Sequence, residues 1–452
     1  MERFFNPRSV AVIGASRNPS KLGHVIIQNM VTAGFKGKIY PINPNAHFIL
    51  HLPCFSSVLT VPYTIETAIV CVPSALVPQV LEECGKKGIK DIIMITAGFS
   101  EIGNKELDRI TLSILRKYHM RMVGPNCLGT LDTYSNFDNL FLPRSRLTRP
   151  KPGIISFICQ SGAVGSATLD LLAKEGMRFA KFVSYGNALD VDESDMLEYL
   201  GNDKKTKIIC LYLEGIRDGK KFMEIAKKVA RKKPIIAIKG GVTAAGAKAT
   251  LSHTASLAGA AGIYKAAFKQ CNLIYAETLE DLFNYAKILE KAPKPKGNRV
   301  QIITNGGGFG ILATDSLSNY GMQITEPSEK TKRFLKKKLP QEATINNPID
   351  LTGSVTTEAY KHALNAVLKD RNVDAVLLIV LLQTPLITPE IIDVINEAKR
   401  KHAKKPVVVV STGGHFTEMY MRHMEELGIP CFVYPNNAAK ALKALCDYYT
   451  RR

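Results

Sequence analysis

The sequence predicts an α/β protein with three doubly wound domains in series. Apolar runs of strand length alternate with helical patterns along the whole chain. These runs are almost continuously apolar, which is typical of parallel strands covered on both faces. With 452 residues, 46% hydrophobic and 22% charged, the chain exceeds one ordinary domain and has the composition of a globular protein with sizeable cores.

The first domain is expected over residues 1–143. Helical patterns at Pro78–Lys87 and Lys105–Tyr118 lie between its strand-like runs. A stretch rich in proline and arginine, Pro143–Pro152, then predicts a linker. The predicted strands are Ser9–Ile13, Lys38–Ile42, Ala68–Val72, Asp91–Ile95 and Arg121–Val123.

The second and third domains are expected over residues 152–291 and 298–452, joined by a second linker at Lys291–Gly297. The strands predicted in the second domain are Gly153–Ile158, Phe179–Val183, Lys207–Leu213, Pro234–Ile238 and Leu273–Tyr275. Those of the third are Arg299–Ile303, Met322–Ile324, Ala375–Leu382, Pro406–Val410 and Pro430–Val433.

The composition excludes several classes of protein. No run of 18 apolar residues exists and the N-terminus lacks a signal-peptide pattern, so we expect a cytoplasmic protein without a membrane span. The nine cysteines are scattered in apolar runs without a Cys-x-x-Cys pair. They predict buried thiols rather than disulfides or metal ligands.

The net charge of +20 raises the question of nucleic acid. Lysines are spread along the whole chain, and aromatic residues make up only 8% and do not alternate with them. Runs such as Lys336–Lys338 and Lys399–Lys401 are typical of solvated helix faces. Nucleic-acid binding is therefore disfavoured, whereas a polyanionic cofactor or an acidic partner subunit remains compatible with the charge.

The first strand-to-helix turn, Gly14 to Gly23, occupies the place where a Rossmann-like sheet binds a dinucleotide-like ligand. Its glycines do not match Gly-x-Gly-x-x-Gly, and the second strand ends at Asn43 without an acidic residue, which disfavours NAD. A phosphorylated adenosine ligand suits the turn, with Ser16 and Lys21 directed at phosphate. The alternative is a purely structural turn.

The later strands of the first domain end in matching features. Val72 and Pro73, Thr96, and Gly124-Pro125-Asn126 follow three successive strands. Ligands bind outside the carboxyl ends of strands in such sheets, so these residues predict a long cofactor lying across the edge.

Two further turns between strand and helix are rich in small residues. They are Ser161-Gly162-Ala163 in the second domain and Asn305-Gly306-Gly307 in the third. Small residues leave the N–H groups of a helix start open to an anion, which predicts two helix ends converging on one phosphate. The alternative is that glycine serves only the backbone conformation.

His253 is the candidate for the chemistry, because it lies in a stretch of small residues between Gly246 and Gly262. An imidazole there can act as a base, a metal ligand or an acceptor of a phosphoryl group. No second His or Cys lies nearby, which disfavours metal, and the stretch lacks the Gly-Lys-Ser/Thr end of a Walker A loop. Glu214, at the end of the neighbouring strand, could fix the imidazole tautomer. A structural histidine is the alternative.

Seven motifs, in order along the chain, resemble the α subunits of NDP-forming acyl-CoA synthetases. This family includes the ADP-forming acetate–CoA ligases and belongs to the succinyl-CoA synthetase superfamily. The motifs are Gly14-Ala-Ser16 with Lys21-Leu-Gly23, Gly124 to Gly129, Gln160-Ser-Gly162, Leu213-Glu214-Gly215, Ser252-His253-Thr254, Asn305 to Gly308 and Asn347 to Gly353. One departure is Ala255, where the family commonly has glycine.

The resemblance implies a CoA-binding Rossmann-like domain followed by two flavodoxin-like domains. It implies a ligase that interconverts acyl-CoA, ADP and phosphate with acid, ATP and CoA. In that reaction His253 would be phosphorylated and Glu214 would orient it. The phosphate would be held by Ser161, Gly162, Ala163, Asn305, Gly306 and Gly307. The CoA site would be formed by Gly14, Ala15, Ser16, Lys21, Leu22, Gly23, Asn43, Val72, Pro73, Thr96 and Asn126.

The resemblance also implies partners. ATP or ADP with Mg²⁺ would lie on an ATP-grasp β subunit in an α2β2 assembly, and the substrate would be a small carboxylic acid. The alternative is a CoA-binding regulatory or acyl-transfer module without ligase activity. The presence of both His253 and Glu214 argues against such a module.

Overall fold

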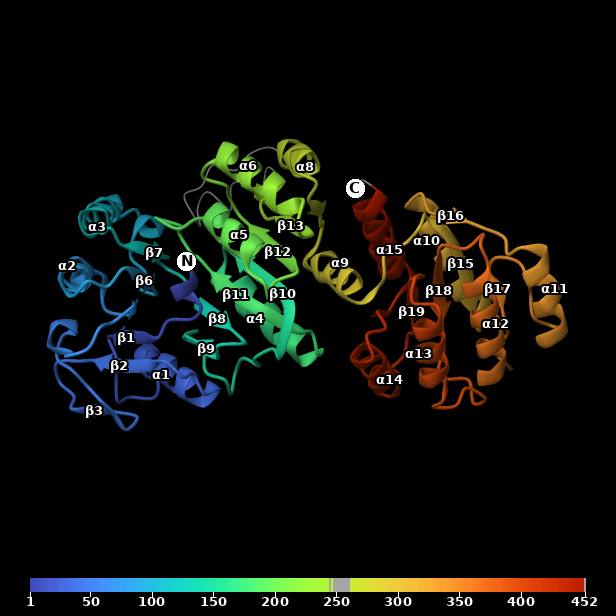
Figure 1. Ribbon diagram of the computed structural model, residues 1–452, viewed down its shortest axis with the longest axis horizontal. Coiled ribbons are helices and arrows are strands. Elements are labelled where there is room, and N and C mark those ends of the chain that lie inside the picture. The colour runs from blue at the N-terminus through green and yellow to red at the C-terminus, as the bar shows by residue number, and fades with distance from the viewer. Residues whose placement is uncertain (244, 247–260, 451–452) are drawn as a thin grey trace. The chain divides into compact units, whose positions relative to one another are not determined.

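A computed structural model describes the chain except for residues 244, 247–260 and 451–452. The described residues form two compact units, Met1–Glu277 and Thr278–Arg452 (Figure 1). Three large, mainly parallel sheets flanked by helices confirm the predicted α/β class.

The first sheet of the N-terminal unit is entirely parallel, in the order β2-β1-β5-β6-β7. Its strands are β1 (Ser9–Ile13), β2 (Lys38–Ile42), β5 (Thr67–Val70), β6 (Asp91–Met94) and β7 (Arg121–Val123). The helices between them are α1 (Leu22–Ala33), α2 (Val77–Lys87) and α3 (Lys105–Tyr118), and a short hairpin joins β3 (Phe48–Ile49) to β4 (Leu52–Pro53).

The second sheet has the order β14-β13-β12-β10-β11-β8-β9. Its parallel part is β10 (Pro152–Cys159), β11 (Phe179–Ser184), β12 (Ile208–Leu213), β13 (Ile235–Lys239) and β14 (Ile274–Tyr275). Its helices are α4 (Gly162–Lys174), α5 (Glu193–Asn202), α6 (Gly219–Ala230) and α8 (Ala261–Gln270).

The hairpin of β8 (Gly129–Asp132) and β9 (Phe137–Asp138) extends this second sheet. Strand β8 runs antiparallel to β11, with Lys181 opposite Asp132 and Ser184 opposite Gly129. The sequence analysis predicted no strand here and assigned the segment to the first domain. The chain therefore leaves the first sheet at β7 and completes the edge of the second sheet before entering it at β10.

The two sheets of the N-terminal unit share one hydrophobic core, to which both contribute buried side chains. Phe5 stacks on Tyr199 with ring centroids 5.2 Å apart. In the stretch predicted to be a linker, the buried Arg149 lies 2.8 Å from the buried carboxylate of Asp138. This stretch is consequently fastened to the unit by an internal ion pair.

The C-terminal unit contains the third sheet, in the order β16-β15-β18-β19-β20, with β17 also pairing with β15. Its strands are β15 (Arg299–Thr304), β16 (Gln323–Ile324), β17 (Ile349–Asp350), β18 (Ala375–Ile379), β19 (Val407–Val410) and β20 (Cys431–Phe432). Its helices are α9 (Leu279–Lys291), α10 (Gly307–Asn319), α11 (Glu329–Lys338), α12 (Thr357–Lys369), α13 (Ile391–Lys401), α14 (His415–Glu426) and α15 (Pro435–Thr450).

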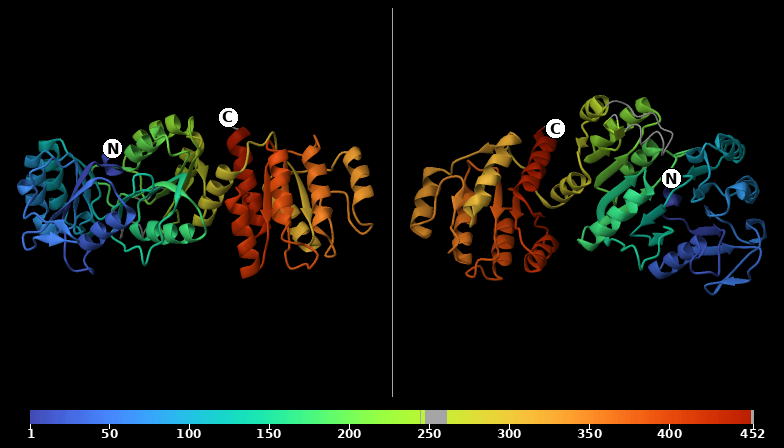
Figure 2. Two further views of the ribbon diagram at one scale, coloured as in Figure 1. Left: turned by 60° about the horizontal axis from the view of Figure 1, so that its bottom comes forward. Right: turned by 180° about the vertical axis from the view of Figure 1, so that it is seen from behind.

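Helices lie on both faces of this third sheet (Figure 2). Helix α9 packs on α15, and Lys440 lies 3.2 Å from Asp281. Lys287 of α9 also pairs with Glu425 of α14 at 2.7 Å. The segment of α9, which the sequence analysis assigned to the second expected domain, 152–291, thus packs within the C-terminal unit.

All nine cysteines are free thiols; seven are buried, and Cys54 and Cys71 are half-buried. Within the described ranges, no helix has the length and apolarity needed to cross a membrane. The same residues contain no cluster of three or more His, Cys, Asp or Glu side chains suited to a metal ion.

Candidate functional site

The first strand-to-helix turn depends on two glycines. Gly14 has φ of +94°, and a Cβ atom on it would lie 2.5 Å from the carbonyl oxygen of Cys71. A Cβ atom on Gly23 would lie 2.2 Å from the carbonyl oxygen of Gly14. Only glycine permits helix α1 to start directly against the turn at the end of β1.

Several predicted cofactor residues brace this turn. The Asn43 side-chain amide donates to the Ala15 carbonyl at 2.7 Å, and its oxygen accepts from the Asn45 N–H at 2.8 Å. The Ser16 hydroxyl accepts from the Asn18 N–H at 3.1 Å. Lys21 caps α1 without a side-chain hydrogen bond and is exposed. Asn43 therefore joins the turn after β2 to the turn after β1, whereas the Lys21 side chain is available to an anion.

A cavity of about 670 Å³ lies in the N-terminal unit, where strand ends of both sheets meet. The predicted site residues that line it are Leu22, Val72, Pro73, Thr96, Asn126, Ser161, Gly162, Ala163 and Glu214. The predicted residues Gly14, Ala15, Ser16, Lys21, Gly23 and Asn43 are not among the lining residues. The structure thus brings five of the predicted cofactor residues together with Glu214 and one of the two glycine-rich turns.

A polar network that the sequence analysis missed holds one wall of the cavity. Asn126 has a φ of +55°, and its side-chain N–H donates to the side-chain oxygen of Asn187 at 3.4 Å. Asn187 in turn donates to the Glu101 carboxylate at 2.5 Å, which also accepts from the Gly98 and Phe99 N–H groups. Burial acts to raise the pKa of Glu101, but these hydrogen bonds outweigh it and hold the pKa below its ordinary value. An ionised Glu101 therefore fixes the position of Asn187.

The second wall of the cavity contains the start of helix α4. The Ser161 hydroxyl caps this helix by accepting from the Val164 N–H at 3.3 Å. A Cβ atom on Gly162 would make only ordinary van der Waals contacts, the nearest at 3.6 Å from Leu128, and Gly162 itself lines the cavity. The first N–H groups of a helix have no partner inside it, and they favour an anion. The turn therefore offers the cavity an anion-binding helix start.

Glu214 is held at the cavity by Gln160. The side-chain oxygen of Gln160 accepts from the backbone N–H groups of Glu214 and Gly215, at 2.7 and 3.0 Å. It also accepts from the buried Tyr185 hydroxyl at 3.3 Å. Glu214 and Gln160 are each only 9% exposed, so these contacts are shielded from water. The sequence analysis included Gln160 only as part of a motif, because an isolated glutamine carries no signal of its role.

Two further groups adjoin Glu214. Lys239, the last residue of β13, is 3% exposed. Burial lowers its pKa, which the charge of Glu214 acts to raise. Burial, followed by the charge of Glu214, raises the pKa of Tyr212. A carboxylate, an ammonium and a phenol therefore meet at the ends of β12 and β13.

The second glycine-rich turn lies in the C-terminal unit. Gly306 begins helix α10 without any side-chain cap. The Asn305 side chain holds Leu381, accepting from its N–H at 2.8 Å and donating to its carbonyl at 3.1 Å. A Cβ atom on Gly307 would lie 2.8 Å from a carboxylate oxygen of Asp350. Asn305 is thus committed to the turn, and the predicted phosphate contacts of this turn are left to backbone N–H groups.

His253 lies outside the described residues. The segment that contains it starts after β13, whose last residue Lys239 pairs in register with Leu213. Glu214 follows Leu213 directly. The described end of β13 therefore adjoins the predicted carboxylate partner of His253.

Three family models match consecutive parts of the chain. A CoA binding domain matches residues 8–133, a succinyl-CoA ligase like flavodoxin domain matches residues 152–289, and a Ligase-CoA domain matches residues 300–451. Together they span both units of the chain.

Relatives match the chain over nearly its whole length. It is 39% identical to subunit alpha of ADP-forming acetate–CoA ligase II from Pyrococcus furiosus, with 98% of this chain and 97% of the relative covered. It is 43% identical to an ADP-forming acetate–CoA ligase from Methanocaldococcus jannaschii, with 98% of this chain covered. This chain spans only 62% of the length of that second relative.

A solved structure with a similar fold is the dinucleotide-forming acetyl-coenzyme A synthetase 1 of Ca. Korarchaeum cryptofilum, in complex with phosphate and ADP. The TM-score is 0.93 and the identity 38%, with 99% of this chain and 97% of that chain covered.

Proposed function

The chain belongs to the ADP-forming acetate–CoA ligase family, and we propose on this basis that it is the α subunit of an acyl-CoA synthetase. The reaction converts acyl-CoA, ADP and phosphate into carboxylic acid, ATP and CoA, or runs in reverse. The phosphoryl group travels between acyl phosphate and nucleotide on His253.

The observation that carries this proposal is the shared cavity of the N-terminal unit. Val72, Pro73, Thr96 and Asn126, from the segment matched by the CoA binding domain model, line the same cavity as Glu214 and the start of α4. CoA supplies a thiol that accepts the acyl group. A cavity that binds the thioester beside an anion-binding helix start places phosphate where it can displace CoA from the acyl carbon.

The residues of this chain have separable roles in the proposal. The helix start at Ser161, Gly162 and Ala163 stabilises the negative charge of phosphate without reorganising. Glu214, fixed by Gln160, accepts a hydrogen bond from one ring nitrogen of His253 and leaves the other free to attack phosphorus. The start of α10 at Gly306 and Gly307 is the second phosphate holder. Phosphate first displaces CoA from the acyl carbon to give the acyl phosphate. Transfer through one histidine then divides the passage of the phosphoryl group from acyl phosphate to ADP into two displacements at phosphorus, which release first the carboxylate and then His253.

We further propose that the nucleotide, with Mg²⁺, is bound by an ATP-grasp β subunit in an α2β2 enzyme. This chain spans 97% of each of two relatives named subunit alpha, whereas it spans 62% and 64% of two relatives that carry no subunit designation. The part of those relatives beyond the match is the counterpart of a separate β polypeptide.

The alternative, a CoA-binding regulatory or acyl-transfer module, is separated from the ligase by a labelling experiment. The pure chain, with and without the β polypeptide, is incubated with acetyl-CoA and radiolabelled phosphate, and His253→Ala serves as the control. An acid-labile, base-stable label that His253→Ala abolishes supports the ligase. CoA binding without label, even with the β polypeptide present, supports the module. ADP-dependent turnover by the pure chain would refute the need for a β subunit.

A further inference from the structure

A second pocket, of about 1000 Å³, lies in the C-terminal unit. Its residues and the glycine-rich turn at Gly306 belong to opposite ends of the strands of the third sheet. Fifteen residues line it, and they come from the segments 296–299, 323, 368–374 and 401–405. These segments lead into strands β15, β16, β18 and β19, whose shared edges are parallel. The pocket therefore occupies the amino ends of the strands, whereas Gly306 follows the carboxyl end of β15.

The charge of the pocket is strongly positive. Seven of the fifteen lining residues are lysine or arginine, and Asp374 is the single carboxylate among them. Asp370 lies close to Lys405, and the ends of helices α12 and α13 add roughly one negative charge between them. Subtracting the two carboxylates and the helix ends from the seven cations leaves an excess of about four positive charges.

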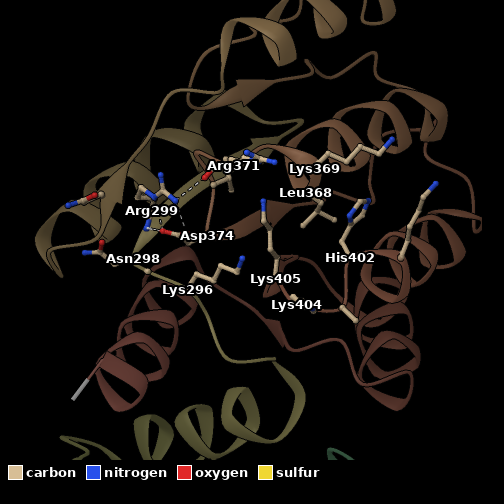
Figure 3. A pocket seen from close by; sticks show the side chains of 15 residues that line it. Lys296, Asn298, Arg299, Leu368, Lys369, Arg371, Asp374, His402, Lys404 and Lys405 are labelled. Carbon is tan, nitrogen blue, oxygen red and sulfur yellow. Dashed lines mark hydrogen bonds and ion pairs between the residues drawn. The ribbon is translucent and has the colours of Figure 1, made fainter. Parts of the chain in front are cut away.

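The one carboxylate of the lining is already paired. Arg299 donates to both oxygens of Asp374, at 2.8 and 2.9 Å, and the dashed lines in Figure 3 mark this interaction. Lys405 donates to the Asp370 carbonyl oxygen. Within the described part of the chain, Lys296, Lys369 and the Arg371 side chain make no ion pair or hydrogen bond. Figure 3 shows Lys296 and Lys405 extending toward the same space.

His402 lies among the lysines of the pocket. Its buried Nε2 atom has no hydrogen-bond partner among the described residues. Burial lowers the pKa of His402, and the neighbouring Lys369, Lys401 and Lys405 lower it further. Burial also lowers the pKa of Lys405, although Asp370 and Asp374 oppose the shift. The mutual repulsion of these cations, most of which are exposed, is a cost that a bound anion would reduce.

We propose that this basic pocket binds a small ligand through a polyphosphate group. Lys296 and Lys405 extend from separate turns toward one space and can contact several phosphate oxygens at once, and Arg371 adds a planar donor. The volume suits a ligand the size of a nucleoside di- or triphosphate. The ligand would bridge the turns before β15, β18 and β19 and so act at the edge opposite the glycine-rich turn.

The test compares two triple variants of the full chain that remove the same charge. Lys296→Gln, Lys369→Gln and Arg371→Gln neutralise the pocket, whereas Lys336→Gln, Lys337→Gln and Lys338→Gln neutralise exposed residues of α11. Calorimetry with tripolyphosphate is expected to give saturable binding that the pocket variant weakens by about tenfold or more, equivalent to about 1.4 kcal/mol. The α11 variant is expected to bind like the native chain. Equal weakening in both variants, or no saturable binding, overturns the proposal.

A second readout identifies the place of binding. The pKa of His402, followed by NMR and assigned with His402→Gln, is expected to rise when tripolyphosphate binds, because the anion offsets the neighbouring lysines. Repeating the titration with ADP tests whether a nucleoside adds affinity. Binding of ADP as tight as or tighter than that of tripolyphosphate, or of tripolyphosphate tighter than that of ADP, supports a polyphosphate ligand in either case. If tripolyphosphate and ADP leave this pKa unchanged while an acidic partner polypeptide raises it, the pocket is a protein-docking surface and the proposal fails.

Discussion

Replacing Gln160 by Met tests how Glu214 is held. The native side-chain oxygen accepts from two buried backbone N–H groups, those of Glu214 and Gly215. Methionine has a similar length and no comparable acceptor, so both N–H groups lose their partner, as does the buried Tyr185 hydroxyl that donates to the same oxygen. Each unsatisfied buried group costs about 1–3 kcal/mol, which predicts a loss of about 3 kcal/mol in the free energy of unfolding of the N-terminal unit. That is a large fraction of the roughly 5–15 kcal/mol typical of a domain.

The same substitution should impair phosphorylation more than it impairs cofactor binding. A displacement of about 1 Å at a reacting group costs on the order of a hundredfold in rate, so the labelling of His253 should slow to that extent. CoA affinity should stay within about twofold, because Gln160→Met removes no hydrogen bond to the predicted cofactor residues. Urea unfolding, hydrogen exchange at residues 214 and 215, and label incorporation measure the three quantities.

Gln301→Met provides the matched control in the C-terminal unit. Gln301 is fully buried, but among the described residues its side-chain oxygen accepts no hydrogen bond. The control should leave labelling unchanged and residues 214 and 215 as protected as before. Native-like protection at these residues in Gln160→Met, with a loss of stability below about 0.5 kcal/mol, would refute the bracing role.

Three further predictions concern the N-terminal unit, two of them at Glu214 and Lys239 and one at the buried Glu193. Glu214→Gln keeps the shape but loses the charge, so label on His253 should fall by about 10²–10⁴-fold while CoA affinity measured by calorimetry is unchanged; equal labelling would exclude Glu214 as the orienting group. Lys239→Met should abolish the opposing charge beside Glu214 and slow labelling by about tenfold with little loss of stability, and a faster reaction would contradict a supporting role. Burial raises the pKa of Glu193 to about 7, so the folded state binds a proton that the unfolded state releases, and stability falls as pH rises from about 4.5 to 7. Glu193→Gln should therefore gain up to about 3 kcal/mol over the native chain at pH 8 and nothing at pH 4 in urea unfolding, and a pH-independent difference would refute it.

Periodicity and turn chemistry predicted the parallel sheets well. The predicted runs Ser9–Ile13, Lys38–Ile42 and Arg121–Val123 are the observed β1, β2 and β7, and Lys105–Tyr118 is α3. These segments carry strong local signals, because a buried parallel strand is apolar throughout and an amphipathic helix repeats every 3.6 residues. The hairpin of β8 and β9 has neither signal, since its strands are short and one of them carries the buried Asp138.

The lining of the cavity was predictable where a residue's position in the sheet determines it, whereas the roles of the lining residues stay predictions. Thr96 and Asn126 were found because residues at the carboxyl ends of parallel strands meet at one edge. Asn43 stands at such an end too, but its amide braces Ala15 rather than lining the cavity. Asn187 and Gln160 act through contacts with residues distant in sequence, for which a single sequence holds no signal.

The hairpin of β8 and β9 has a consequence for how this protein can be divided or recombined. Strand β11 would be an open edge without β8, and open edges pair with other chains. A gene fragment that encodes only residues from β10 onward would therefore produce an aggregation-prone sheet, and a fragment that ends after β9 would expose a hairpin lacking its support. Any exchange of the first sheet for another would therefore need to retain β8 and β9, because they complete the edge of the second sheet.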